Sequence, residues 1–191
     1  ASMGLQPVEV MHNGEKVVIE RGHDENATLP EEFLKTDRSC PPFCIQPMSA
    51  AEGVETVGEI EVLDYLGRAA SGETVLVVDS RTPDWVLRGT IPGSVNIPWN
   101  QIDPQQQGMF GDSGDSYLQT LMTEQFGAKV ADGGLDFSDA KTLVLYCNGI
   151  WCGQSRANIA TLVRIGYPTD KLKWYRGGMQ DWVSAGLTTA K

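Results

Sequence analysis

Residues 142–156 read TLVLYCNGIWCGQSR and combine a regular strand pattern with most of the candidate chemistry of the chain. The run Thr142–Tyr146 is short, uninterrupted and apolar, which is typical of a parallel strand buried on both faces. Cys147 follows directly, and a loop with two glycines leads to Ser155, which we expect to be the N-cap of a helix over 155–165. The stretch therefore predicts a strand, a loop that begins with a cysteine, and a helix.

Predicted strands alternate with predicted helices on both sides of this stretch. The other expected elements are a helix over about 57–68, a strand over 75–78 that ends at Asp79, a brief strand within 91–98, a helix near 117–126, a strand over 172–175 and a final helix over 179–185. Such alternation predicts an α/β domain whose open, mostly parallel sheet is flanked by helices.

Residues 1–53 differ from this pattern and are predicted to form an arm, with the domain covering 54–191. A hairpin is expected around Asn13-Gly14, a dipeptide that tolerates positive φ at both turn positions. A short helix over about 30–35 and the extended or turning segment Cys40-Pro41-Pro42-Phe43-Cys44 follow it. The arm has too few apolar residues for a core of its own and too many to leave in water. We therefore expect it to pack against the domain.

Length and charge limit the classes of function. A chain of 191 residues fits one domain, with or without an arm. Twenty-five acidic against fifteen basic residues give a net charge of −10, which argues against binding to nucleic acid or anionic lipid. No apolar stretch approaches the about 18 residues that a membrane-spanning helix needs. No metal site is expected, because Cys40 and Cys44 lack the paired spacing of structural zinc ligands.

Cys147 is the leading candidate for a reactive group. A residue at the carboxyl end of a buried parallel strand faces the crevice in which open α/β sheets bind ligands. A glycine-containing loop before a helix can point its backbone N–H groups inward and bind an anion. The same field would stabilise a thiolate or persulfide at Cys147. The alternative is that Cys147 is an inert core thiol.

The other cysteines and the histidines leave alternatives open. Cys152 lies five residues after Cys147, near enough for a disulfide or for resolution of a persulfide, or it packs beside Trp151 as an ordinary loop residue. Trp151 itself is either an apolar wall of a pocket or a surface or core aromatic residue. Cys40 and Cys44 can pair if their segment turns tightly, and four cysteines allow three full pairings. The two histidines, His12 and His23, are expected to be exposed turn residues.

Four separated segments, in order, carry a resemblance to a known family. They are Asp79-Ser80-Arg81, the stretch IPGSVNIP at 91–98, the junction Tyr146-Cys147, and the stretch RGGMQDW at 176–182. Together they make residues 54 to 187 similar to a rhodanese-like domain. The resemblance implies a sulfurtransferase whose cysteine accepts a sulfane sulfur and passes it to a thiophilic acceptor.

Carried over to this sequence, the resemblance implies that Cys147 is the catalytic residue. The residues that bind the substrate or persulfide would then be Asn148, Gly149, Ile150, Trp151, Cys152, Gly153, Gln154, Ser155 and Arg156. The implied substrates are thiosulfate, polysulfide or a persulfide donor, with a thiol as acceptor and no cofactor. The physiological donor and acceptor and the oligomeric state stay open.

The sequence departs from the family pattern at two places. Thr90 replaces the usual histidine before the IPG motif, which we expect to affect only local packing. The loop after Cys147 is about two residues longer than usual and has Gln154 where an arginine is expected. Longer loops resemble those of dual-specificity phosphatases and arsenate reductases, which need an arginine six residues after the cysteine. Arg156 is nine residues after Cys147 and four after Cys152, so neither cysteine fits. The main alternative to an enzyme is a redox or sulfur-binding module that uses Cys147 and Cys152.

The arm also bears on localisation. Disulfides persist outside the cytosol, and arms with Cys-Pro-Pro-Phe-Cys ahead of such a domain resemble those of exported bacterial members of the family. The start Ala-Ser-Met fits removal of an export signal and a tag remnant equally well. We therefore expect a periplasmic protein, with a cytoplasmic one as the alternative.

Overall fold

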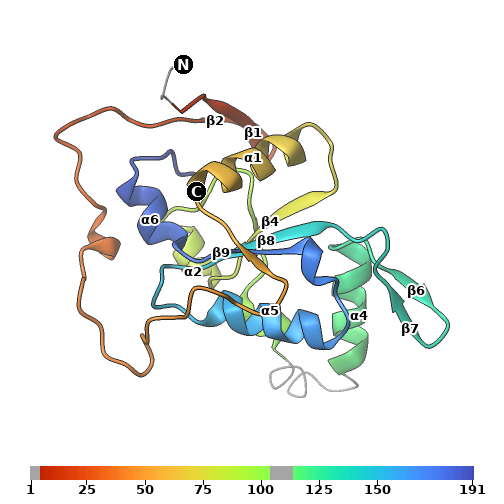
Figure 1. Cartoon of the computed structure of the whole chain (residues 1–191). Coiled ribbons are helices and arrows are strands. Elements are labelled where there is room, and N and C mark those ends of the chain that lie inside the picture. The colour runs from red at the N-terminus through yellow and green to blue at the C-terminus, as the bar shows by residue number, and fades with distance from the viewer. Residues whose placement is uncertain (1–4, 104–113) are drawn as a thin grey trace.

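The computed structural model describes residues 5–103 and 114–191 and is built around a five-stranded sheet (Figure 1). The strand order is β3-β9-β8-β4-β5, and every neighbouring pair is parallel. The strands are β3 (Glu55–Thr56), β4 (Val75–Asp79), β5 (Val95–Asn96), β8 (Thr142–Tyr146) and β9 (Leu172–Tyr175). The predicted α/β class and mostly parallel sheet are confirmed. β8 lies at the centre of the sheet, so its carboxyl end is flanked by strand ends on both sides.

Helices cover both faces of the sheet (Figure 1). They are α1 (Glu59–Ala70), α2 (Pro83–Val86), α4 (Gly114–Glu124), α5 (Gln154–Arg164) and α6 (Gly178–Ser184). Successive β8 residues point to opposite faces, so Leu143 and Leu145 pack with α4 and α5, whereas Val144 packs with α1 and α6. The uninterrupted apolar run of β8 is explained by burial on both faces.

The arm begins with the expected hairpin, which consists of β1 (Val8–His12) and β2 (Glu15–Ile19). Asn13 and Gly14 both have positive φ, 50° and 81°, as the two-residue turn requires. Val10 and Ile19 are buried in the same apolar cluster as α1 and α6. A boundary at residue 53 between arm and domain stays a prediction.

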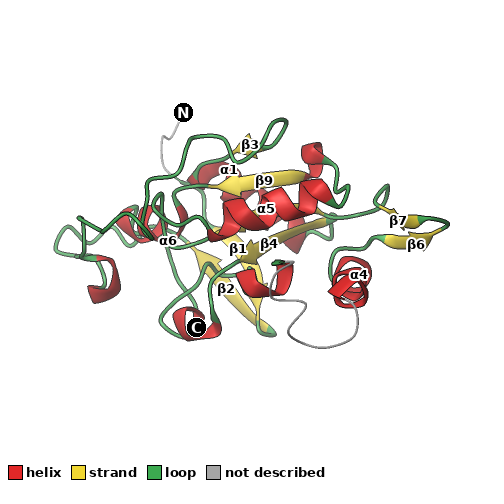
Figure 2. Cartoon of the chain, turned by 90° about the horizontal axis from the view of Figure 1, so that it is seen from below, coloured by secondary structure: helices red, strands yellow, loops and turns green. Residues whose placement is uncertain are grey.

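Several elements differ from the sequence-based expectations. The predicted helix over 30–35 is a single 3₁₀ turn, Glu31–Phe33. A projecting hairpin, β6 (Lys129–Ala131) and β7 (Gly134–Asp136), was not anticipated, although its Asp132-Gly133 turn is a recognisable signal (Figure 2). The predicted N-cap at Ser155 is wrong, because α5 begins at Gln154 and its N-cap is Gly153. The side chain of Ser155 is instead buried and bonded to another element, as described below.

In the part of the chain that the structure describes, no helix has the length and apolar character needed to cross a bilayer. Residues 1–3, the Ala-Ser-Met start, lie outside the described residues.

Candidate active site

Cys147 is the first residue after β8, at the carboxyl edge of the sheet. Its carbonyl oxygen accepts a hydrogen bond from Met179 N at 2.9 Å, and Asn148 O accepts one from Gln180 N at 2.9 Å. Gly178 makes this approach of α6 possible. It has a φ of +56°, and a Cβ there would lie 2.2 Å from Cys147 O. Gly178 of the C-terminal motif therefore lets α6 hold the start of the cysteine loop.

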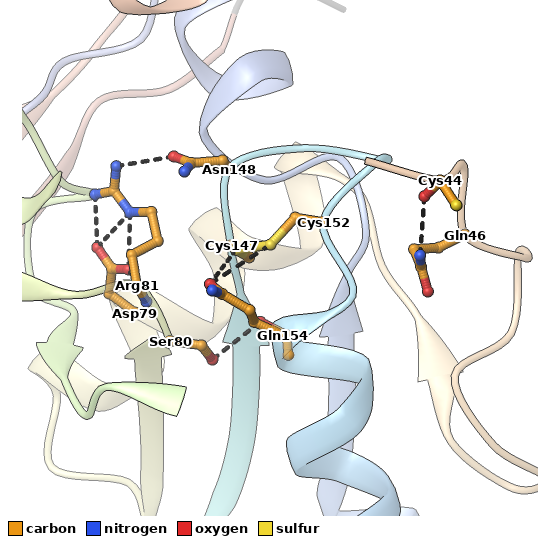
Figure 3. Close-up of a disulfide and its surroundings, with 10 residues drawn as sticks. Cys44, Gln46, Asp79, Ser80, Arg81, Cys147, Asn148, Cys152 and Gln154 are labelled. Atoms are coloured by element: carbon orange, nitrogen blue, oxygen red, sulfur yellow. Dashed lines mark hydrogen bonds and ion pairs between the residues drawn. A yellow bond between two sulfur atoms is a disulfide. The ribbon is translucent and has the colours of Figure 1, made fainter. Parts of the chain in front are cut away.

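The loop that follows Cys147 is closed by a disulfide to Cys152, with 6.3 Å between the two Cα atoms (Figure 3). A backbone hydrogen bond of 3.0 Å from Cys152 N to Gly149 O forms a turn inside the same loop. Only 3% of Cys147 is exposed, whereas Cys152 is half-buried. The bridge therefore occupies the sulfur of Cys147, and Cys152 is the more exposed of the two residues.

Gln154 and Ser155, in the first turn of α5, lie beside this bridge. The Gln154 Oε1 atom is 3.2 Å from Cys147 Sγ and 3.7 Å from Cys152 Sγ (Figure 3). Bridged sulfurs carry no hydrogen, so either cysteine can donate to this oxygen only as a reduced thiol. The buried Ser155 hydroxyl donates to Ser80 Oγ, 2.9 Å away at the end of β4. Ser155 therefore joins α5 to the neighbouring strand.

A buried ion pair supports the loop from the side of β4. The Arg81 guanidinium binds the Asp79 carboxylate, with Nη2 to Oδ2 at 2.7 Å and Nε to Oδ1 at 2.9 Å, and both residues are about 1% exposed or less. Arg81 Nη1 also donates to Asn148 Oδ1 at 3.2 Å (Figure 3). The Asp-Ser-Arg motif contributed to the family resemblance, but the sequence analysis assigned it no role at the site. The position of this motif at the carboxyl end of a buried strand was the signal that could have indicated a role at the site.

Thr90 takes part in the same buried network. Its hydroxyl donates to Asp79 Oδ2 at 2.7 Å and lies 2.8 Å from the hydroxyl of Tyr146. Burial and the negative charge of Asp79 raise the pKa of Tyr146 well above its usual value, so its hydroxyl stays protonated and donates to Asp79. The expectation that Thr90 affects only local packing is too narrow, because Thr90 bonds to the carboxylate that positions Arg81.

The arm crosses the outer side of the loop. Gln46 N donates to Ile150 O at 2.8 Å, and the guanidinium of Arg176 holds the same arm segment by donating to Gln46 O at 2.8 Å. The Arg38 guanidinium lies 4.0 Å from the ring centroid of Trp151. Trp151 is half-buried and also meets the edge of Phe43, with the ring centroids 6.0 Å apart. The aromatic side chain therefore serves as the contact between loop and arm.

The arm segment carries its own disulfide, between Cys40 and Cys44, with 4.5 Å between their Cα atoms. Of the three full pairings that the sequence allowed, the structure thus has the one with two local bridges, which uses all four cysteines.

The remaining candidates are distributed as follows. Gly149 and Gly153 lie in the loop, where Gly153 packs against the Gln46 side chain. Arg156 is half-buried on α5, and its Nε is a buried donor without a hydrogen-bond partner in the described residues.

Of the two histidines, His23 is exposed as expected. The expectation is wrong for His12, which is half-buried and accepts a hydrogen bond from Gly93 N at Nδ1. Within residues 5–103 and 114–191, no group of three or more His, Cys, Asp or Glu side chains is arranged to hold a metal ion.

Comparisons with known proteins give one family. The model of the rhodanese-like domain matches residues 62–185, well over half of the chain. No curated protein matches the sequence.

Solved structures resemble the chain at low identity. A Rhodopseudomonas palustris protein of unknown function, described as a possible tyrosine phosphatase, is 20% identical, with 74% of this chain and 88% of that chain covered and a TM-score of 0.46. A human single-domain sulfurtransferase is 18% identical, with 69% and 96% covered and a TM-score of 0.43. A rhodanese-related protein from Thermoplasma volcanium is 15% identical, with 71% and 97% covered and a TM-score of 0.40. On the strength of the family match, the chain belongs to the rhodanese-like domain family.

Proposed function

We propose that the protein is a sulfurtransferase that carries a sulfane sulfur on Cys147. The observation that carries the proposal is the position of this cysteine, which begins the loop between the central strand and α5. That edge of an open parallel sheet is where such folds bind small ligands. Membership in the rhodanese-like family supports the same reaction class.

In the proposed reaction, the Cys147 thiolate attacks the outer sulfur of the donor, and the donor's remaining group leaves with the bonding electron pair. The donor is thiosulfate, a polysulfide or a persulfide. Thiosulfate, for example, would release sulfite. A thiol acceptor then attacks the outer sulfur of the Cys147 persulfide and regenerates the thiolate. Covalent catalysis of this kind divides one transfer into two easier steps, and no cofactor is required.

The loop from Asn148 to Gln154 would stabilise the anionic persulfide through its backbone N–H groups and the amino end of α5. Arg81 would act as a positioning residue, because it binds Asn148 and not the sulfur. Gln154, the neutral residue beside Cys147 Sγ, would accept a hydrogen bond from the reduced Cys147 thiol at Oε1, without the charge of the usual arginine. We therefore propose that the backbone amides of the loop recognise the sulfur donor. Arg156 would provide an additional positive charge on the same helix as Gln154.

The Cys147–Cys152 bridge favours a second candidate function, a redox or sulfur-binding module that presents this pair to a partner protein. The two functions predict different products. An enzyme yields a persulfide on Cys147 and a modified acceptor, whereas a redox module yields only reversible oxidation of the pair. A phosphatase or arsenate reductase is not favoured, because Arg156 is displaced from the position that such loops require.

We also propose that the protein is a periplasmic, single-domain member of the exported type, with residues 1–53 as an arm on a domain of 54–191. The Cys40–Cys44 bridge supports this proposal, because Cys40 is exposed to any cellular reductant and such bridges are rare in reducing cytosol. Peptide mapping of non-reduced protein from its native host tests it. Four free thiols in freshly quenched cells would instead indicate the cytoplasm.

The enzymatic proposal is tested by trapping the persulfide. The loop of residues 147–153 is called the active loop below. Reduced Cys152→Ser protein, which cannot re-form the bridge of this loop, is freed of reductant, treated with thiosulfate or benzenethiosulfonate, alkylated and mapped by mass spectrometry of its peptides. We expect a mass gain of one sulfur atom on the peptide that contains Cys147. The matched Cys147→Ser protein should show no gain. Absence of the gain in Cys152→Ser, or unchanged transfer in Cys147→Ser, would overturn the proposal.

A further inference from the structure

The two cysteines of the active loop differ in accessibility but share one set of supporting contacts. Cys147 is 3% exposed and Cys152 is half-buried. Both sulfurs lie beside the same Gln154 oxygen, at 3.2 and 3.7 Å. A cysteine pair that served only to staple the fold would not need to include the candidate nucleophile.

The bridge forms while the loop keeps three backbone hydrogen bonds to two other parts of the chain, α6 and the arm. These contacts are the hydrogen bonds from Met179 N to Cys147 O, from Gln180 N to Asn148 O and from Gln46 N to Ile150 O. The turn from Cys152 N to Gly149 O brings the end of the loop back toward its start. Cys152 Sγ is therefore held against Cys147 Sγ by the folded structure. A nucleophile held in this way reacts with an effective concentration far above that of a free thiol.

We propose that Cys152 resolves the Cys147 persulfide and that the protein thereby releases sulfide, a reductive activity beyond transfer to an acceptor. The inference rests on the proposed function, because it begins from the Cys147 persulfide. The Cys152 thiolate attacks Cys147 Sγ, the bond between Cys147 Sγ and the outer sulfur breaks, and the outer sulfur leaves with the bonding pair as hydrosulfide. The two cysteines are oxidised to the disulfide seen in the structure, and the sulfane sulfur is reduced.

Each turnover then needs a dithiol or two thiols as reductant. Cys152 is half-buried whereas Cys147 is buried, so the thiol attacks at Cys152, the mixed disulfide forms there and Cys147 leaves as the thiolate. A second thiol releases Cys152, and the reductant leaves as its own disulfide. This order of steps agrees with the burial of the two cysteines. The reductant acts at the more exposed Cys152, and the sulfane sulfur is accepted at the buried Cys147.

The experiment is a single turnover without an external acceptor. Protein is reduced, freed of reductant and mixed with benzenethiosulfonate, a donor whose other product is a sulfinate and which contains neither thiol nor sulfide. For the wild type we expect stoichiometric sulfide, a re-formed Cys147–Cys152 bridge and no lasting persulfide. For Cys152→Ser we expect a persulfide on Cys147 and sulfide release lowered at least about tenfold.

The Cys40→Ser/Cys44→Ser protein is the matched control, because it lacks the other bridge and should release sulfide like the wild type. A wild-type persulfide as long-lived as that of Cys152→Ser would overturn resolution and leave the sulfurtransferase proposal standing. A persulfide found on Cys152 would also overturn resolution, because the sulfane sulfur would then have been transferred from Cys147 to Cys152 and not released as sulfide. If Cys152→Ser forms no persulfide and the wild type releases no sulfide, the proposed function fails as well.

Discussion

The two disulfide loops of this protein are alike in chemistry and almost alike in size, yet their surroundings differ. The Cys40–Cys44 bridge closes a segment of the arm with an exposed cysteine, whereas the Cys147–Cys152 bridge closes a loop at the carboxyl end of the central strand. The arm loop contacts the domain through a stack of Arg38, Phe43 and Trp151. The loop after β8, which contributes Trp151 to that stack, also contacts a buried ion pair, α5 and α6.

The spacing of the cysteines is almost the same in both loops, so our proposal of a structural pair in the arm and a reactive pair after β8 rests on the surroundings of the two bridges. A reactive pair needs an accessible sulfur for the reductant, a protected sulfur for the substrate and neighbours that stabilise a charge. In the loop after β8, Cys147 is buried, Cys152 is half-buried and the first residue of α5 lies beside the bridge. The arm loop has an exposed cysteine and contacts Trp151 through Phe43. The following predictions test this contrast.

The largest effect on stability is expected from the support under the active loop. Arg81→Ala leaves the Asp79 carboxylate buried without its cation, and breaking such a pair costs about 3–5 kcal/mol in the free energy of unfolding. Urea denaturation measures it. Arg68→Ala, which removes exposed ion pairs with Asp64 and Glu73, should change the unfolding midpoint far less.

A double variant separates lost charge pairing from lost packing. Asp79→Asn/Arg81→Met leaves no unpaired buried charge, so its cost should be smaller than that of Arg81→Ala alone. If Arg81→Ala were as stable as the wild type, the ion pair could not be the support of this loop.

Removal of either bridge should have a similar effect on the stability of the protein, but only removal of the Cys147–Cys152 pair should abolish sulfur transfer. Because the cysteines are four and five residues apart, loop-closure entropy gives each bridge about 2 kcal/mol or less. The Cys40→Ser/Cys44→Ser and Cys147→Ser/Cys152→Ser proteins should therefore lose similar free energies of unfolding in urea. Sulfur transfer should persist in the first and fall to background in the second. Loss of transfer in both would mean that the arm bridge belongs to the site.

A smaller effect is expected on the docking of the arm against the active loop. Arg38→Ala removes the cation from the face of Trp151, an interaction of about 1 kcal/mol when partly buried. Limited proteolysis within residues 34–46 should then be roughly fivefold faster, because cleavage follows the population of the detached arm. Lys35→Ala, an exposed neighbour, should not change the rate. Equal rates for both variants would show that this stack does not hold the arm.

The smallest effect is expected on the pH dependence of stability, through His12 in the hairpin of the arm. Burial lowers the pKa of His12 below its usual 6.5, and neutral Nδ1 accepts the hydrogen bond from Gly93 N. The unfolded chain therefore binds a proton at higher pH than the folded one. The contribution of His12 to stability is complete above pH 6.5 and declines as the pH falls toward the lowered pKa. Unfolding of wild type and His12→Asn, compared between pH 5 and 8, should show this slope only in the wild type. His23→Asn is the control, and a slope retained in His12→Asn would assign it to other groups.

The sequence predicted most elements of the domain, because its strong patterns come from burial. β8 was predicted with its observed bounds, since a strand covered on both faces must be apolar throughout. The hairpin of the arm was predicted from Asn13-Gly14, whose backbone preferences are local. The 3₁₀ turn Glu31–Phe33 was overestimated as a helix, because its length depends on the contacts of Phe33 with the core.

The sequence by itself determined the α/β class, the loop that begins with Cys147 and the resemblance to one family, because these depend on local propensity, periodicity and short motifs. Only the tertiary structure decided which cysteines pair, how Arg81 reaches Asn148, and that the arm lies over Trp151. Arg81 and Asn148 are 67 residues apart in the chain, and contacts of this kind exist only once parallel strands have aligned their carboxyl ends. Pairing of cysteines likewise depends on distances and directions in space, which spacing along the chain constrains but does not set.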